Sequence, residues 1–377
     1  MLEKVIKEAR TEIKGFWGFC KKKRNRPLII SVVFFLILGI GLAQVAKSQV
    51  QRSLVEQMLH REQVIARSEA RSIERFFESV ARVVMTESDC PMIEAFGLVA
   101  QERMSELIDK WEGIALTELL LIDSQGQVKY EVSREETRVV ENPGVSVADR
   151  EYFIQAKSAK ESRIYIGDPV QARGGPFQGE YVVPVAAPII EAGRFKGVLV
   201  GGVLLSQLID NYLEPLIISE RTEVHLINSE NVIIGSSLVD LIGNNLSKYT
   251  ESGVREETRI KLEELVREVE ETSEGKVEVV LESLDGSGKQ EEILIAVSTV
   301  HLDKVSLGGL PDWYVAVETP REDAMHFFGM FGAAIRIVIT VLILMTLCFS
   351  AALIMTMRLV QEDAYLDGLT DGRRKRK

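Results

Sequence analysis

Two uncharged hydrophobic segments lie near the ends of the chain. Residues 28–46 carry no charged side chain over 19 positions, and residues 337–357 carry none over 21. A helix of either length is long enough to cross the hydrocarbon core of a bilayer. The pattern therefore predicts two transmembrane helices, with most of the chain between them.

Basic residues are concentrated outside these two segments. Lys21, Lys22, Lys23, Arg24 and Arg26 lie around the start of the first segment, and residues 373–377 are all basic. Under the positive-inside rule both ends of the chain are cytoplasmic. We therefore expect a two-pass protein in contact with the lipid bilayer, with residues 47–329 exported and a cytoplasmic tail at 358–377.

Residues 1–27 bear on whether the first segment is retained. A cleaved signal peptide is the alternative, because Gly41, Leu42 and Ala43 could form a small-residue processing site. The apolar residues before the segment recur at helical spacing, as they do in helices that lie in the membrane interface. This spacing favours a retained, basic and amphipathic cytoplasmic segment. Its apolar residues are Leu2, Val5, Ile6, Ala9, Ile13, Phe16 and Trp17.

A long helix follows the first segment. Residues 47–84 contain neither glycine nor proline, and apolar residues recur there at steps of three and four. Polar residues at 66–72 interrupt this apolar face. The pattern predicts a membrane-proximal half that pairs in a homodimer and a distal half that packs in the core. The alternative is that both halves pack only on their own domain.

The rest of the exported region shows two rounds of strand patterns. A helical stretch near 103–111 precedes two strand-like runs, 117–123 and 128–132, which flank a Ser-Gln-Gly turn as in a hairpin. A short helix then begins at Asp149. Further strand-like runs at 163–166, 180–190 and 195–205 give a predicted sheet of about five strands.

The second round repeats this plan in shorter form. A hairpin at 223–228 and 232–236 precedes a charged helix at 255–271. Three strand-like runs follow, at 276–284, 292–300 and 313–318. The predicted fold class is α+β, with two transmembrane helices flanking a long helix and two tandem antiparallel-sheet modules. We place the distal module at about 85–210 and the proximal module at about 211–326.

Charge and cysteine content narrow the possible partners. The chain has 45 Lys and Arg against 56 Asp and Glu, a net charge of −11, which argues against a nucleic-acid partner. Cys20, Cys90 and Cys348 fall in three different predicted compartments, so no disulfide joins them within one chain. Cys90 is expected as a half-buried thiol, or alternatively as a bridge to its mate in a dimer.

Four runs of sequence carry a family resemblance. They are LLLIDSQGQVKY from Leu119, DREYF from Asp149, YVVPVAAPIIEAGRFKGVLVGGVLL from Tyr181 and WYVAVETP from Trp313. In this order, between two apolar segments, they resemble the double Cache sensor domain of bacterial receptors over about residues 49–326. The resemblance implies two PAS-like modules outside the plasma membrane, a small-molecule pocket in the distal module, and a signal passed across the membrane.

The resemblance also implies candidate binding residues. Receptors of organic acids in this family carry an Arg-x-Tyr-Phe motif above the pocket, which Arg150, Tyr152 and Phe153 match. A guanidinium offers paired donors to a carboxylate, and the tyrosine hydroxyl adds a neutral donor. The alternative is that Arg150 only pairs with Asp149 or Glu151 at the surface.

Further candidates follow the motif. Tyr165 and Asp168 lie where similar receptors present groups to the ligand, and Asp168 could accept a hydrogen bond from a ligand amine. Alternatively, Asp168 only begins a turn before Pro169. Some dicarboxylate receptors carry a lysine where this chain has Gly201 and Gly202, so we expect a monocarboxylate, an amino acid or a similarly small polar ligand.

No catalytic, cofactor or metal motif stands out in the exported region. The four histidines, His60, His225, His301 and His326, lie far apart without paired ligand spacing. HExxH, CxxC, GxSxG and phosphate-loop motifs are absent from the sequence. We therefore predict a protein that is not an enzyme and binds no cofactor or metal.

The tail resembles the opening of a diguanylate cyclase domain. Asp367, Leu369 and Thr370 match an Asp-x-Leu-Thr-Gly-Leu-x-Asn-Arg-Arg segment, after which the pattern is shortened. Three hypotheses remain open: a truncated or frameshifted cyclase-type receptor, a stand-alone sensor with a cytoplasmic signalling partner, and a solute-capture or adhesive protein that uses the same fold.

Overall fold

One long helix, α2, runs from Arg26 to Ser88. Pro91 follows shortly after its end, and a proline disfavours helical backbone in the residue before it. Cys90 is accordingly extended, with φ −79° and ψ 126°. The single helix expected over 47–84 is confirmed, and it continues to Ser88.

The computed structural model describes residues 26–110, 116–134, 139–141, 143–159, 163–217, 219, 221–246, 255–282, 289–302, 312–326, 340–341 and 343–345. These residues belong to two compact units. One unit is Met1–Val55 with Met325–Lys377, and the other is Glu56–Ala324. Both sheets lie in the second unit.

The predicted membrane segments differ in how far they are described. Residues 28–46 are helical as part of α2. Across the described parts of the chain, no helix has the length and apolar character needed to cross a membrane. Residues 1–25, most of 337–357, and the whole tail with its cyclase resemblance lie outside the described residues.

Seven antiparallel strands form the distal sheet, in the order β3-β2-β1-β7-β6-β4, with β5 paired to β6. The expected number was about five. The prediction missed β3 and β5 because each has two residues, too few to show an alternating pattern. The strands are β1 Glu118–Asp123, β2 Val128–Ser133, β3 Val140–Glu141, β4 Tyr165–Ile166, β5 Val170–Gln171, β6 Tyr181–Glu191 and β7 Arg194–Leu204.

The proximal sheet has five strands in the order β10-β11-β12-β8-β9. In both sheets the first strand lies between its hairpin partner and the last strand of the module, as β1 does between β2 and β7. The repeated plan inferred from the sequence is thus confirmed. The strands are β8 Glu223–Ile227, β9 Ile233–Ser236, β10 Glu274–Glu282, β11 Gln290–Val300 and β12 Trp313–Pro320.

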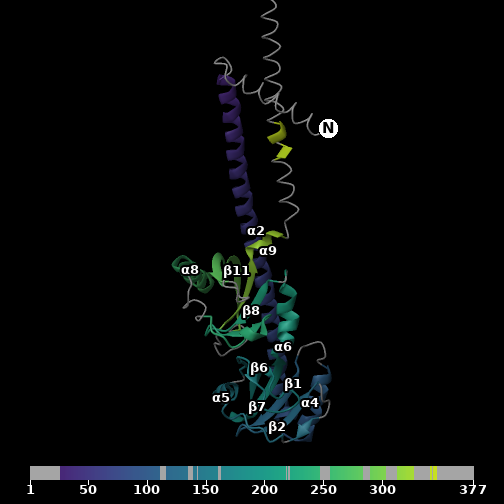
Figure 1. The fold of residues 1–377 in the computed structure, drawn as a ribbon. Helices are drawn as coiled ribbons and strands as arrows, with labels where there is room; N and C mark the ends of the chain where they lie inside the picture. Colours follow the sequence, from purple (N-terminus) through teal and green to yellow (C-terminus); the bar gives the residue numbers. More distant parts are fainter. Residues whose placement is uncertain are drawn as a thin grey trace, which may run out of the picture. The chain divides into compact units, whose positions relative to one another are not determined.

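Short helices cover the two sheets. Figure 1 shows α4 and α5 on opposite faces of the distal sheet. Helix α5 begins after Arg150, where the sequence predicted a short helix. The helices are α3 Pro91–Glu94, α4 Leu98–Lys110, α5 Glu151–Ser158, α6 Leu205–Leu208, the π-helix η2 Ile209–Leu213, the 3₁₀ helices η3 Glu214–Leu216 and η4 Val239–Leu241, α8 Glu256–Thr272 and α9 Arg321–His326.

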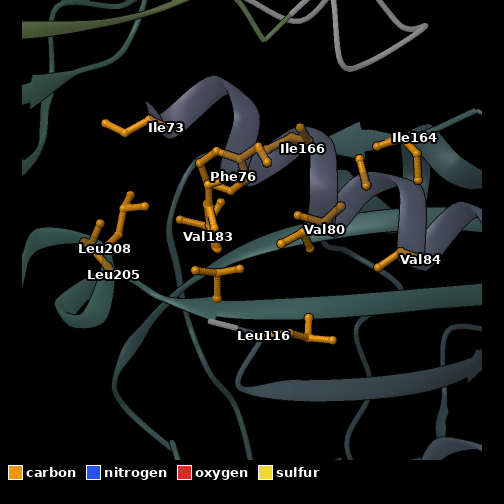
Figure 2. Packing of buried hydrophobic residues seen from close by; sticks show 14 of the residues in the cluster. Ile73, Phe76, Val80, Val84, Leu116, Ile164, Ile166, Val183, Leu205 and Leu208 are labelled. Atoms are coloured by element: carbon orange, nitrogen blue, oxygen red, sulfur yellow. The ribbon is translucent and has the colours of Figure 1, made fainter. Parts of the chain in front are cut away.

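Helix α2 supplies one face of a core shared by the two sheets. Figure 2 shows Phe76 and Val80 of α2 packed with buried side chains that include Val183 of β6. The same cluster contains Trp313 of β12, and Phe77 meets its indole edge-on, with 5.5 Å between ring centroids. Such aromatic pairs add to the stabilisation from buried area.

The polar interruption expected at 66–72 is not a break in the packing. Ala66 and Ala70 are 0% and 1% exposed, and they continue the buried face from Met58 towards Ile73. Small side chains allow the helix to lie close to its neighbours, and the hydrophobicity pattern alone does not reveal this. The α2 residues from Met58 onward therefore pack on their own domain.

Candidate functional site

A cavity lies between the distal sheet and the beginning of α5. It encloses about 530 Å³ of empty space, a volume that includes the open solvent at its mouth. Its apolar walls are mostly valine side chains, which come from β2, β5, β6, β7 and the segment before α5. The polar side chains that line it are Glu118, Glu131, Arg150, Tyr152, Gln171 and Arg173.

Arg150 stands at the N-terminal end of α5. Its backbone is extended, with φ −74° and ψ 138°, and its amide nitrogen donates to the carbonyl of Val147, 2.9 Å away. The guanidinium Nη2 donates to the carbonyl of Gln171 at 2.6 Å. This bond satisfies one of the five donors of the guanidinium and holds the group at the mouth of the cavity.

A second guanidinium lies at the same end of the cavity. Arg173 binds both carboxylate oxygens of Asp149, at 2.5 and 2.6 Å, and its Nη1 also donates to the carbonyl of Ser146 at 3.0 Å. Hydrogen bonding to Arg173 lowers the pKa of Asp149 to about 2. The surface partner of Asp149 is therefore Arg173, which leaves Arg150 available to the cavity.

The floor of the cavity carries buried carboxyl groups. Glu118 of β1 is 5% exposed and Glu131 of β2 is 3% exposed. Burial, and secondarily the charge of Glu131, raises the pKa of Glu118 to about 7. A cationic ligand group would remove the mutual repulsion of the two carboxylates and hold Glu118 in its charged form.

Gly202 of β7 makes room for this floor. It lies directly opposite Glu118 in the β1–β7 register. A Cβ at Gly202 would come within 2.5 Å of Glu118 Oε1 and 2.4 Å of its Cγ, closer than such atoms can approach. The absence of a side chain at position 202 therefore admits the Glu118 carboxyl into the cavity.

Tyr152 lies near both Arg150 and Glu118, whose charges act on its hydroxyl. The side chain is 5% exposed and lines the cavity. Burial raises the pKa of its hydroxyl, so the hydroxyl is a neutral donor at any physiological pH. Together these groups place positive charge at an open rim, negative charge at a buried floor and a neutral donor near both.

Two of the five predicted site residues line the cavity, namely Arg150 and Tyr152. Phe153 is 2% exposed and packs edge-on against Phe195, with 6.1 Å between ring centroids. Phe153 belongs to a cluster of buried hydrophobic side chains, and Tyr165 packs against that cluster. Burial raises the pKa of the Tyr165 hydroxyl. These two aromatic side chains support α5 on the sheet.

Asp168 lies away from the cavity. Its Oδ1 accepts a hydrogen bond from Trp313 Nε1 at 3.1 Å, and its Oδ2 accepts one from Asn228 Nδ2 at 2.7 Å. Both donors belong to the proximal module. Asp168 therefore joins the two modules rather than lining the distal cavity.

Sequence reasoning missed Glu118, Glu131 and Arg173. The available signal was a charged residue within an apolar strand, since Glu118 begins the run ELLLID and shares a face with Leu120. Glu131 lies opposite Leu120 in the β1–β2 register and so faces the same cavity. Arg173 had no comparable signal, because it lies in a loop.

The domain architecture agrees with a family comparison. A family model described as "Cache domain" matches residues 46–326. The chain therefore belongs to the Cache domain family, and the resemblance inferred from the sequence is confirmed. No curated protein matches the chain.

Several solved structures are similar to this chain at low sequence identity. The ligand-binding domain of the Pseudomonas fluorescens chemoreceptor CtaA, solved with L-isoleucine, has a TM-score of 0.51 at 15% identity, covering 74% of this chain and 98% of that one. The Pseudomonas aeruginosa amino acid chemoreceptor PctB, solved with L-Arg, has 0.49 at 15%, covering 74% and 93%. The Campylobacter jejuni chemoreceptor Tlp3, solved with L-valine, has 0.48 at 12%, covering 73% and 97%.

Proposed function

We propose that this protein is a membrane-bound, non-catalytic sensory receptor whose distal module binds a small amino acid. The observation that carries this proposal is the opposed charge of the cavity, with Arg150 at the rim and Glu118 at the floor. An α-amino acid carries a carboxylate and an ammonium group, and each would meet an opposite charge. A structural neighbour of the chain, the ligand-binding domain of the chemoreceptor CtaA, was solved with the amino acid L-isoleucine.

The ligand carboxylate binds at the rim in this proposal. Arg150 keeps free donors besides the one given to the Gln171 carbonyl, and two parallel N–H groups suit a carboxylate. Tyr152 adds its neutral hydroxyl. Removing the guanidinium would cost about 1.5–3 kcal/mol, which corresponds to roughly ten- to hundred-fold in affinity.

The ligand ammonium binds at the floor. Glu118 and Glu131 are the buried acceptors there, and the valines of the wall exclude water around them. This arrangement favours an amino acid over the monocarboxylate also expected from the sequence, because a simple carboxylate carries no cation to bind the buried carboxyl group of Glu118.

A thermal-shift screen of the purified full-length protein tests the binding site. The probes are the twenty protein amino acids and, for each hit, the matching N-acetyl derivative and α-hydroxy acid. A ligand that binds the folded state raises the melting temperature by mass action. We expect hits among free amino acids and none among their two analogues, which lack the ammonium group.

Variants locate the hit in the cavity. Arg150→Ala and Glu118→Gln should each weaken the shift and raise the Kd by calorimetry, whereas Arg194→Ala, an exposed arginine at the start of β7, should leave both unchanged. Equal shifts in all proteins would place the ligand elsewhere. An α-hydroxy acid that shifts the melting temperature as much as the matching amino acid would return the ligand to the monocarboxylate class.

We also propose the two-pass topology, with spans at 28–46 and 337–357 and the Cache domain outside a bacterial plasma membrane. The support is the basic charge outside the two apolar segments. A reporter enzyme that is active only outside the cytoplasm, fused after Ser229, should be active. Activity of a cytoplasmic reporter at the same place would contradict this topology.

In this proposal the signal is transmitted by a homodimer, in which two chains pair along residues 47–84 of α2. Val50 is 36% and Val64 45% exposed on α2, so apolar surface remains on this helix after the domain has packed. Light scattering of the full-length protein in detergent should give the mass of two chains, and Val64→Glu should shift it towards one. A single-chain mass in the unmodified protein would exclude the dimer. The signal is then passed to a cytoplasmic signalling partner.

A further inference from the structure

A group of side chains that could bind a metal ion lies in the proximal sheet, away from the distal cavity. Glu223 and His225 are on β8, and Glu318 is on β12. Residues two apart on a strand share a face, and Glu318 is the direct cross-strand neighbour of Glu223. The ligand atoms of all three side chains lie within 4.8 Å of one another.

His225 is held with one ring nitrogen facing the carboxylates. The residue is 2% exposed, and its Nδ1 pairs with Ser236 Oγ of β9 at 2.9 Å. The other nitrogen, Nε2, lies 3.7 Å from Glu223 Oε2. Metal-binding histidines commonly use the second nitrogen in this way, because its hydrogen bond fixes the ring orientation.

The two carboxylates lack an obvious counter-charge. Within the described part of the chain, neither Glu223 nor Glu318 forms an ion pair with a lysine or arginine. Glu223 Oε2 is buried and has no hydrogen-bond partner there. Like charges placed directly opposite each other on neighbouring strands are destabilising.

The spacing fits a metal ion better than a hydrogen bond. A hydrogen bond from the ring nitrogen to a carboxylate would be about 2.7–2.9 Å long. Two ligand atoms at about 2.1 Å from a tetrahedral metal are about 3.4 Å apart. The separation of 3.7 Å between His225 Nε2 and Glu223 Oε2 is close to the second value.

We propose that Glu223, His225 and Glu318 bind a divalent transition-metal ion, with Zn²⁺ as the best match. One imidazole nitrogen with two carboxylates is a ligand set that suits Zn²⁺, whereas Mg²⁺ and Ca²⁺ prefer oxygen ligands throughout. Three protein ligands leave a position for water. The ion would cross-link β8 and β12, two adjacent central strands of the proximal sheet.

Metal content of the full-length protein tests this proposal. The protein is treated with a chelator, loaded with ZnCl₂ and desalted, and its zinc is measured by mass spectrometry and by titration calorimetry. We expect one Zn²⁺ per chain and a rise in melting temperature on loading. Loading with Co²⁺ should give the visible absorption of a low-symmetry nitrogen and oxygen site.

Variants decide whether these residues hold the ion. Glu318→Gln and His225→Gln should abolish stoichiometric binding, and Ser236→Ala should weaken it about ten- to hundred-fold through loss of ring orientation. The matched control is Glu292→Gln, a β11 glutamate paired with Arg321, and it should bind normally. Circular dichroism checks that each variant is folded.

Two results would overturn the proposal. Unmodified protein that retains no Zn²⁺ after desalting rules the site out directly. Full stoichiometry in Glu318→Gln and Ser236→Ala places the ion on other residues. If Glu318→Gln does not fold, Ser236→Ala together with the Co²⁺ spectrum decides, because that variant leaves all three ligands in place.

Discussion

The carboxylate of Asp168 accepts a hydrogen bond from the indole nitrogen of Trp313, which lies 145 positions further along the chain. Trp313 is 1% exposed, so this is the polar contact of a buried ring. The same carboxylate also accepts from Asn228. One aspartate after β4 thus joins the distal module to β12 and to the turn after β8 in the proximal module.

Asp168→Ala should destabilise the protein by about 1–3 kcal/mol, because it leaves the buried indole N–H of Trp313 without an acceptor. Urea denaturation monitored by tryptophan fluorescence measures the change. Asp240→Ala, an exposed aspartate in the 3₁₀ helix η4, is the control and should cost much less. Equal costs for the two variants would show that the Asp168–Trp313 bond contributes nothing.

Glu62 of α2 should make stability fall as pH rises. Burial raises its pKa from 4.5 to about 8, so between these values the folded chain binds a proton that the unfolded chain has released. The ionisation of this side chain alone should then lower the free energy of unfolding by about 3 kcal/mol between pH 5 and pH 8.

Glu62→Gln should remove that dependence and stabilise the protein at pH 8 more than at pH 5. Denaturation of both proteins at the two pH values measures the difference between them, which separates Glu62 from the other buried carboxyl groups. Glu78→Gln, exposed on the same helix and paired with Arg82, should change the curve little. A constant difference between Glu62→Gln and the unmodified protein at both pH values would contradict the prediction.

Gly202→Ala should disturb the floor of the distal cavity. The added methyl group would overlap the Glu118 side chain, and overpacking of this kind costs about 1–3 kcal/mol. The double variant Glu118→Ala with Gly202→Ala should recover part of that loss, because the clashing side chain is then shortened.

Thermal denaturation of the single and double variants gives the coupling free energy between positions 118 and 202. Gly97→Ala serves as a control, since a Cβ there meets no atom closer than 3.8 Å. Strictly additive effects of the two substitutions would show that Gly202 and Glu118 do not share the space.

Phe77→Ala should be among the most damaging substitutions in α2. The side chain is 0% exposed and packs on the Trp313 ring. Its removal leaves a cavity, which should lower the free energy of unfolding by about 3–5 kcal/mol. Ile154→Ala, a 52% exposed position on α5, is the control. A loss below about 1 kcal/mol for Phe77→Ala would mean that α2 does not contribute to the shared core.

Most of the helices and strands, and their order, could be predicted from local sequence patterns. Local patterns placed α2, both hairpins, α5, α8 and the long strands, because helix and strand periodicities depend on neighbouring residues. The motif at Arg150 and Tyr152 was recognisable for the same reason, since its members lie within one turn of a helix. The two-residue strands β3 and β5 carry too little pattern and were missed.

Contacts between side chains that are distant in sequence could not be predicted in this way. Glu118 reaches the cavity because β7 pairs with β1 and presents Gly202 opposite it, a register between residues 84 positions apart. Asp168 turned towards Trp313 instead of the cavity for a similar reason, as strand order brought the proximal module beside it. Such contacts depend on sheet topology and packing between segments remote in sequence, and no local pattern of residues encodes them.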